Sequence, residues 1–255
     1  MRFLSTRATW DDADMSRRGP LIGVCGATGG GKSTVVGPLA GALGLSVWPE
    51  RVHDNAFFGR YMADRGAWAF RAQVAFMLGA LEDAASARAS PQGGVVERPA
   101  AELFGVFAQD LQEAGHLIVD EVDLLKRLVT IGEQLCGVPD AMVMLHASAD
   151  KLFARIRTRR RPGEERYTLA DIERLTARYE SWSLSWNRCP TIDVDTDEVD
   201  LRTRASVARL AGEVRRRLVD DVAEGATHGD RSSQLRFALR DDGDAVDTLR
   251  ATGIE

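Results

Sequence analysis

Residues 21–33 read LIGVCGATGGGKS, and this stretch decides the fold. Its first five residues are apolar, as in a buried strand, and helical spacing begins at Ser33 and runs to Leu43. The glycine-rich residues 26–33 match the P-loop pattern in the context that gives it meaning, after a strand and before a helix. We therefore predict a strand, a loop and a helix that hold the phosphates of a nucleoside triphosphate. The alternative is a glycine-rich turn that binds nothing.

The residue types in this loop each have a chemical reason. Glycines let consecutive backbone N–H groups turn toward phosphate oxygens at the positive end of the following helix. The Lys32 ammonium is expected to bridge the β- and γ-phosphates, and the Ser33 hydroxyl to ligate Mg²⁺. Lys32 is the only lysine in the first 125 residues of an arginine-rich chain, which favours a role that needs a compact ammonium. The expected donor-binding residues of the loop are Gly26, Ala27, Thr28, Gly29, Gly30, Gly31, Lys32, Ser33 and Thr34.

Composition and charge exclude several classes of protein. The chain has 255 residues, of which 44% are hydrophobic and 28% charged, a balance typical of a globular domain. Its net charge of −5 argues against a nucleic-acid partner, which would need a basic face. The apolar stretches are all shorter than the ~20 residues that cross a bilayer, and the acidic residues soon after Met1 lead us to expect no secretory signal there. We expect a cytoplasmic protein with reduced cysteines and without a membrane or nucleic-acid partner.

Strands alternate with helices along the rest of the chain. Short apolar runs recur at residues 45–48, 95–96, 141–145 and 191–194, and helical stretches lie at roughly 66–88, 99–115, 118–136, 150–160, 168–185 and 199–219. This alternation predicts an α/β fold with a parallel sheet covered on both faces. Residues 1–19 are expected to form a flexible arm and residues 221–255 a flexible acidic tail, with at most a short helix at 234–240.

The motifs after the P-loop indicate which kind of P-loop protein this is. The Asn-Lys-x-Asp motif of GTPases is missing from the sequence, so phosphoryl transfer is favoured over a switch function. Further segments resemble, in the same order, motifs of the deoxynucleoside kinase family: WPERV at 48–52, WAFRAQ at 68–73, VVERP at 95–99, VFA at 106–108, RIRTRRRPGEE at 155–165, and the helix at 169–182. The likeness covers about residues 20–198.

This resemblance implies a P-loop kinase at residues 20–220, with three layers, a five-stranded parallel sheet and an arginine-rich lid at about 155–168. It also implies ATP as donor, Mg²⁺, a nucleoside acceptor that receives the phosphate on its 5′-hydroxyl, and a homodimer formed through the helices near 66–88 and 118–136. The lid residues expected to close over the phosphates are Arg155, Arg159 and Arg161. The alternatives for this arginine run are a solvated helix end or a basic patch for nucleic acid.

The resemblance also implies roles for single residues around the acceptor. Glu50 would take the proton from the acceptor hydroxyl, Arg98 would hold that hydroxyl or neutralise charge, and Glu97 would act near Mg²⁺. Independently of the resemblance, a carboxylate at the end of the strand beside the P-loop strand can reach the cleft where open α/β sheets bind ligands. Each carboxylate has the alternative of a solvated strand end. The expected acceptor contacts are Glu50, Tyr61, Trp68, Gln73, Arg98, Phe107 and Glu164.

The sequence departs from the family on the acceptor side. Ala80 and Leu103 stand where the family has an arginine and an aspartate that read the base, and Met62 stands where it has a tyrosine, with Tyr61 beside it. Because unpaired polar groups in a buried pocket are costly, losing this pair should change which acceptor is accepted. We expect a modified or non-standard nucleoside as the acceptor. The alternatives are a non-nucleoside alcohol, a nucleoside monophosphate kinase, or a degenerate kinase that regulates by binding nucleotide.

Overall fold

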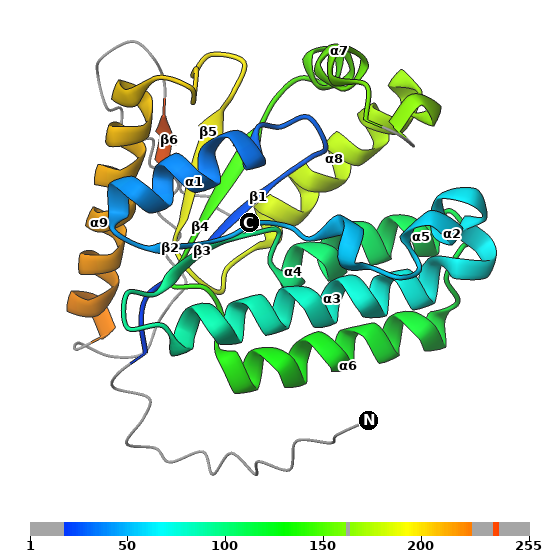
Figure 1. Ribbon diagram of the computed structural model, residues 1–255, viewed down its shortest axis with the longest axis horizontal. Coiled ribbons are helices and arrows are strands. Elements are labelled where there is room, and N and C mark those ends of the chain that lie inside the picture. The colour runs from blue at the N-terminus through cyan, green and yellow to red at the C-terminus, as the bar shows by residue number, and fades with distance from the viewer. Residues whose placement is uncertain (1–17, 162–163, 226–236, 240–255) are drawn as a thin grey trace, which may run out of the picture.

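The computed structural model describes residues 18–161, 164–225 and 237–239. Within them the strands form one parallel sheet in the order β2-β3-β1-β4-β5-β6 (Figure 1). The strands are β1 (Leu21–Gly26), β2 (Ser46–Trp48), β3 (Gly94–Glu97), β4 (Ala141–His146), β5 (Thr191–Asp195) and β6 (Phe237–Leu239). The first strand in the chain therefore lies in the interior of the sheet, and the P-loop follows it there.

The register of the sheet places the candidate residues at one edge. Strand β1 pairs with β3 so that Val24 lies opposite Glu97, and β2 pairs with β3 so that Trp48 lies opposite Val96. Because all these strands are parallel, the P-loop after β1, Arg98 after β3 and Glu50 after β2 leave the sheet on the same side.

Helices cover both faces of the sheet (Figure 1). On one face α1 (Lys32–Leu43) and α9 (Arg204–Gly225) pack on the alternate side chains of β1, β4 and β5. On the other face lie α3 (Arg65–Ala89), α6 (Val119–Cys136) and α8 (Leu169–Ser185). The remaining helical segments are α2 (Phe58–Ala63), α4 (Ala100–Glu102), α5 (Gln109–Glu113), α7 (Ala149–Arg159), the 3₁₀ turns Val52–Asp54 and Glu164–Arg166, and the π-helical segment Leu103–Ala108.

The predicted α/β class, its three layers and its parallel sheet are confirmed, with four local corrections. The strand before Glu50 does not lie beside the P-loop strand as expected, because β3 lies between them. The helix expected at 99–115 contains the π-helical segment, and the helix expected from 199 begins at Arg204. The expectation of a short helix at 234–240 is wrong at Phe237–Leu239, because these residues form a sixth parallel strand that pairs with β5. Residues 1–17 of the expected arm and the rest of the expected tail beyond α9 lie outside the described residues. In the described part of the chain, every helix is too short or too polar to cross a membrane.

Candidate active site

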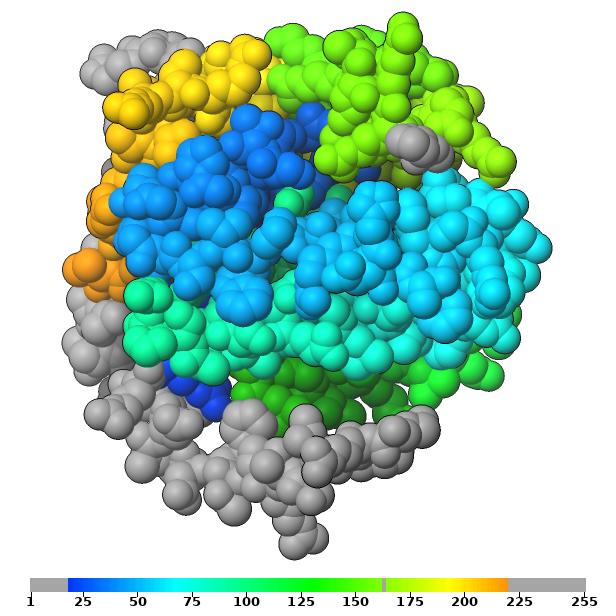
Figure 2. Space-filling view, in the orientation of Figure 1, coloured from blue at the N-terminus to red at the C-terminus, as the bar shows by residue number. Residues whose placement is uncertain are grey.

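A cavity of about 1190 Å³ extends from the P-loop to the π-helical segment. Figure 2 shows its opening, which is surrounded by three regions: the P-loop with α1 (blue), the segment after β2 (lighter blue) and the α7 region (yellow-green). Pockets for a single small molecule measure roughly 300–1,000 Å³, so this cavity has room for a donor and an acceptor together.

The P-loop has the backbone conformation that its glycines predict. Gly29 and Gly31 have φ angles of 87° and 95°, in the left-handed region, and Gly31 is the N-cap of α1. The Lys32 side chain is buried, and its Nζ donates to the carbonyl oxygens of Gly26 at 2.6 Å and Ala27 at 3.1 Å. Burial, with the nearby Arg98 charge, lowers the pKa of Lys32 to about 8. Lys32 is therefore still a cation at neutral pH.

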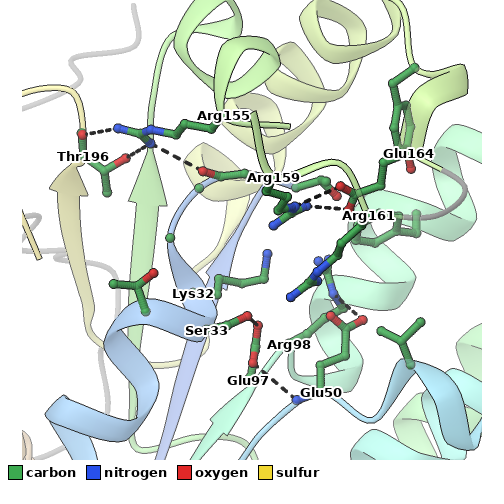
Figure 3. A pocket seen from close by; sticks show the side chains of 18 of the residues that line it. Lys32, Ser33, Glu50, Glu97, Arg98, Arg155, Arg159, Arg161, Glu164 and Thr196 are labelled. Atoms are coloured by element: carbon green, nitrogen blue, oxygen red, sulfur yellow. Dashed lines mark hydrogen bonds and ion pairs between the residues drawn. The ribbon is translucent and has the colours of Figure 1, made fainter. Parts of the chain in front are cut away.

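Glu97 connects the P-loop helix to the segment after β2. Its Oε1 accepts a hydrogen bond from Ser33 Oγ at 2.8 Å, and its Oε2 accepts one from the backbone N–H of Glu50 at 3.4 Å (Figure 3). A hydroxyl and a carboxylate side by side are the oxygen ligands that Mg²⁺ prefers. No cluster of three or more acidic, histidine or cysteine ligands occurs within the described residues, so phosphates and water would complete such a site.

Glu50 and Arg98 form an ion pair at the centre of the cavity. Arg98 Nε lies 2.8 Å from Glu50 Oε1. Burial raises the pKa of the Glu50 carboxyl, but Arg98 and Lys32 outweigh burial and leave this pKa below its ordinary value. Figure 3 shows Glu50, Lys32 and Arg161 pointing into the same space. An ionised carboxylate thus faces the place where the donor's terminal phosphate would lie.

Arg98 itself is held by Phe107 and by two residues, Glu102 and Tyr179, that sequence analysis did not single out. Its φ of 61° is in the left-handed region, which directs the chain from β3 into α4. Its guanidinium lies 4.5 Å from the centre of the Phe107 ring, and its Nη1 lies 3.0 Å from both Glu102 Oε1 and Tyr179 Oη. Glu102 is four residues after Arg98, but Arg98 precedes α4 and is not helical, so helical i, i+4 spacing does not predict the pair. Tyr179 likewise carries no local signal.

The lid arginines are not equivalent. Arg159 Nε donates to Glu164 Oε2 at 2.9 Å, and both residues line the cavity, as does Arg161. Arg155 instead donates to the Thr196 carbonyl oxygen at 2.6 Å, its hydroxyl at 2.9 Å and the Gly29 carbonyl oxygen at 3.4 Å (Figure 3). Arg155 therefore braces the P-loop against the end of β5. Arg155 also lines the cavity, so its expected action over the phosphates together with Arg159 stays a prediction.

The acceptor end of the cavity contains most of the expected contacts. Tyr61, Gln73, Phe107 and Glu164 line it, and burial raises the pKa of Tyr61 to about 12. Gln73 is 2% exposed, and its Oε1 has no hydrogen-bond partner among the described residues. Sequence analysis missed several residues that line the cavity: Val52, His53, Phe58, Phe76 and Tyr167 around the acceptor end, and Asp197, Glu198 and Asp200 after β5.

Trp68 is the expected acceptor contact that the structure does not bring to the cavity. Its ring stacks on Phe57 at 6.0 Å between centroids and lies against the guanidinium groups of Arg60 and Arg71. Trp68 and Gln73 are five residues apart on α3, so the directions of their side chains differ by about 140° around the helix axis. The two side chains therefore leave α3 in different directions, and of the two only Gln73 lines the cavity.

Comparisons with known proteins identify relatives of this chain. A family model described as deoxynucleoside kinase matches residues 22–220. The deoxyadenosine/deoxycytidine kinase of Bacillus subtilis (strain 168) is 27% identical over 71% of this chain and 84% of its own length. The deoxyguanosine kinase of Lactobacillus acidophilus is 30% identical over 71% of this chain and 82% of its own. A solved deoxyadenosine kinase from M. mycoides superposes with a TM-score of 0.64 over 77% of this chain and 99% of its own, at 18% identity, which shows the fold alone.

Proposed function

Because the chain belongs to the deoxynucleoside kinase family and is a phosphotransferase with an alcohol acceptor, we propose that it carries the γ-phosphoryl group of ATP to the 5′-hydroxyl of a non-standard nucleoside. The observation that carries this proposal is the Glu50–Arg98 ion pair in the same cavity as the P-loop lysine. A base and a phosphate cradle on opposite sides of one cavity are what phosphoryl transfer to an alcohol requires.

The proposed reaction uses groups that are already in place. Glu50 accepts the proton of the 5′-hydroxyl while the hydroxyl oxygen forms a bond to the γ-phosphorus. The bond from that phosphorus to the β,γ-bridging oxygen breaks, which releases ADP. Lys32, Arg159 and Arg161 offset the negative charge on the transferred group. Mg²⁺, held by Ser33 and Glu97, would neutralise charge on the phosphate oxygens. Catalysis then depends mainly on positioning and electrostatics.

The acceptor end supports a base that differs from the standard ones. Around Gln73 the cavity is lined by apolar side chains, among them Phe76, Leu103 and Phe107, and Ala80 packs with this apolar cluster. The Gln73 amide can form hydrogen bonds with one edge of a base. Further polar atoms of that base facing Leu103 would lose their hydrogen bonds to water without replacement. We infer that the preferred acceptor carries an apolar substituent at that position.

Measuring ADP release with a series of candidate acceptors would test which acceptor the enzyme prefers. We expect nucleosides with alkyl or halogen substituents on the base to show a kcat/KM at least 10-fold above that of the unmodified deoxynucleosides, since one well-fitted methylene is worth about 10- to 200-fold. Nucleoside monophosphates and simple alcohols, the substrates of the alternative kinases, should release no ADP above the ATP-only rate. Preference for an unmodified deoxynucleoside would overturn the inference about the base, and turnover of monophosphates alone would favour the monophosphate kinase.

The homodimer also has support in the structure. Leu124, Ile131 and Leu135 of α6 are 51%, 54% and 49% exposed at spacings of seven and four residues, and Leu78 of the neighbouring α3 is 44% exposed. Apolar side chains at these spacings lie on one side of a helix, and an exposed apolar stripe of this kind favours association with a second copy. We propose that α3 and α6 form this interface. The cytoplasmic location and the lack of nucleic-acid and membrane partners stay predictions.

Replacing two residues of this stripe tests the interface. The double variant Leu124→Glu with Ile131→Glu should halve the mass measured by light scattering. Association would bury carboxylates without a compensating positive charge in the interface. Leu184→Glu is the matched control, since Leu184 is 68% exposed on α8 and is not part of the α3–α6 stripe. A wild-type chain that is monomeric at micromolar concentration would contradict the proposal, as would a dimer that survives the double substitution.

A further inference from the structure

A fully buried carboxylate lies beneath the catalytic ion pair. Glu102 is the last residue of α4, its side chain is 0% exposed, and it does not reach the cavity. Moving a carboxylate out of water is costly unless charged or polar partners compensate for the lost hydration. The partners of Glu102 therefore indicate why the fold keeps a charge at this position.

Three segments that are far apart in the sequence donate to one oxygen of Glu102. The backbone N–H of Gly26, at the start of the P-loop, lies 3.2 Å from Oε1. Arg98 Nη1 lies 3.0 Å from the same oxygen, and the Tyr179 hydroxyl of α8 also donates to it. The second oxygen, Oε2, has no hydrogen-bond partner in the described part of the chain. Glu102 thus joins the P-loop, the end of β3 and the helix that follows the lid.

Tyr179 completes a closed set of hydrogen bonds with Glu102 and Arg98. Arg98 Nη1 donates to Tyr179 Oη at 3.0 Å, and the Tyr179 hydroxyl proton goes to Glu102. Burial and the Glu102 charge raise the pKa of Tyr179 well above its ordinary value, so it stays a neutral donor. The ring packs edge-on against Phe107, at 6.1 Å between centroids, which leaves the hydroxyl little freedom to turn away.

These contacts fix the guanidinium that faces Glu50. Arg98 has one carboxylate on Nε, from Glu50, and another on Nη1, from Glu102, with the Phe107 ring beneath. Both carboxylates share one positive charge, so Glu50 is not its sole counter-ion. Without Glu102 the guanidinium would be free to rotate, and its attraction for Glu50 would draw the base away from the acceptor hydroxyl.

We propose that Glu102 and Tyr179 are positioning residues that orient Arg98 toward Glu50 and tie the start of the P-loop to α8. This inference rests on the proposed roles of Glu50 and Arg98 in phosphoryl transfer. Neither positioning residue contacts donor or acceptor, so their removal should lower kcat and leave the binding of both substrates nearly unchanged.

Isosteric variants test the proposal in solution. Glu102→Gln should lower kcat about 100-fold, the loss typical of a misplaced catalytic group, and Tyr179→Phe about 10-fold, with KM for ATP and acceptor within 3-fold of wild type. The ATP-binding stoichiometry by calorimetry, one per folded chain, shows that the loss does not come from unfolded protein. Glu213→Gln is the matched control, because Glu213 is a buried, arginine-paired glutamate of α9 outside the site, and its kcat should be unchanged.

A crystal structure of each variant gives a readout that does not depend on turnover. In Glu102→Gln we expect the Arg98 guanidinium to rotate and to move the paired Glu50 carboxylate from its wild-type position. Tyr179→Phe, which keeps the packing of the ring, should show a smaller rotation. An unmoved guanidinium, or a kcat within 3-fold of wild type in both variants, would overturn the proposal. A wild-type chain without turnover of any nucleoside would instead contradict the proposed function, while the position of Arg98 in the variants still decides this inference.

Discussion

The Glu50→Gln variant should retain ATP binding and lose about 1,000-fold in kcat, within the range measured for removing a general base. Glutamine keeps the shape of the side chain and its contact with Arg98, but it cannot accept the acceptor's proton. Arg98 and Lys32 hold the pKa of Glu50 below its ordinary value, so the wild-type carboxylate is ionised throughout the neutral range. Its contribution comes from its position beside the hydroxyl and from the negative charge that it keeps there.

Two measurements separate this role from a structural one. The Kd for ATP by calorimetry should stay within 3-fold of wild type, because Glu50 lies across the cavity from the P-loop amides. Glu82→Gln, a variant of an exposed glutamate on α3, should leave kcat unchanged. A Glu50→Gln enzyme that keeps a tenth of the wild-type kcat would exclude Glu50 as the base and leave charge neutralisation by Arg98 as the main contribution.

The Lys32→Arg variant should lose about 1,000-fold in kcat/KM for ATP, comparable to the loss of one strong donor to a developing charge. The Lys32 ammonium lies buried within the loop, 2.6 Å from the Gly26 carbonyl oxygen. A guanidinium is planar and longer than an ammonium, so it would have to displace the loop or extend past the phosphates. We expect both a higher KM for ATP and a lower kcat.

Lys126→Arg is the matched control for this substitution. Lys126 is exposed on α6, and the same change there should leave kcat/KM within 2-fold of wild type. The comparison also tests the argument from composition, since arginine replaces lysine almost everywhere else in this chain. An active Lys32→Arg enzyme, within 10-fold of wild type, would mean that positive charge alone is sufficient at this position.

Local patterns in the sequence predicted the fold class and the donor half of the site. The P-loop is a continuous stretch whose glycines and lysine act on the same ligand, so its function is visible in consecutive residues. The alternation of apolar runs and amphipathic stretches likewise predicted the parallel sheet, because burial on both faces imposes that pattern. Glu50, Glu97 and Arg98 could be placed at one edge because each lies at or just after the end of a strand of that sheet.

Features that depend on contacts between distant segments were not predictable in this way. Glu102 and Tyr179 are 77 residues apart, and nothing in either neighbourhood indicates that they meet. Trp68 matched a motif, but the direction in which its side chain leaves α3 depends on how α3 packs against α2. The bond of Arg155 to Thr196 depends on the position of the loop after β5.

The physical difference lies in the range of the interactions. Backbone conformation, helical periodicity and the burial of a strand are imposed by neighbouring residues, so the amino-acid order alone shows where phosphates would bind. The orientation of Arg98 results from Glu50, Glu102, Phe107 and Tyr179, which come from three separate segments. Such an arrangement exists only after the helices have packed on the sheet, because packing is what brings these charges and hydroxyls within hydrogen-bond distance.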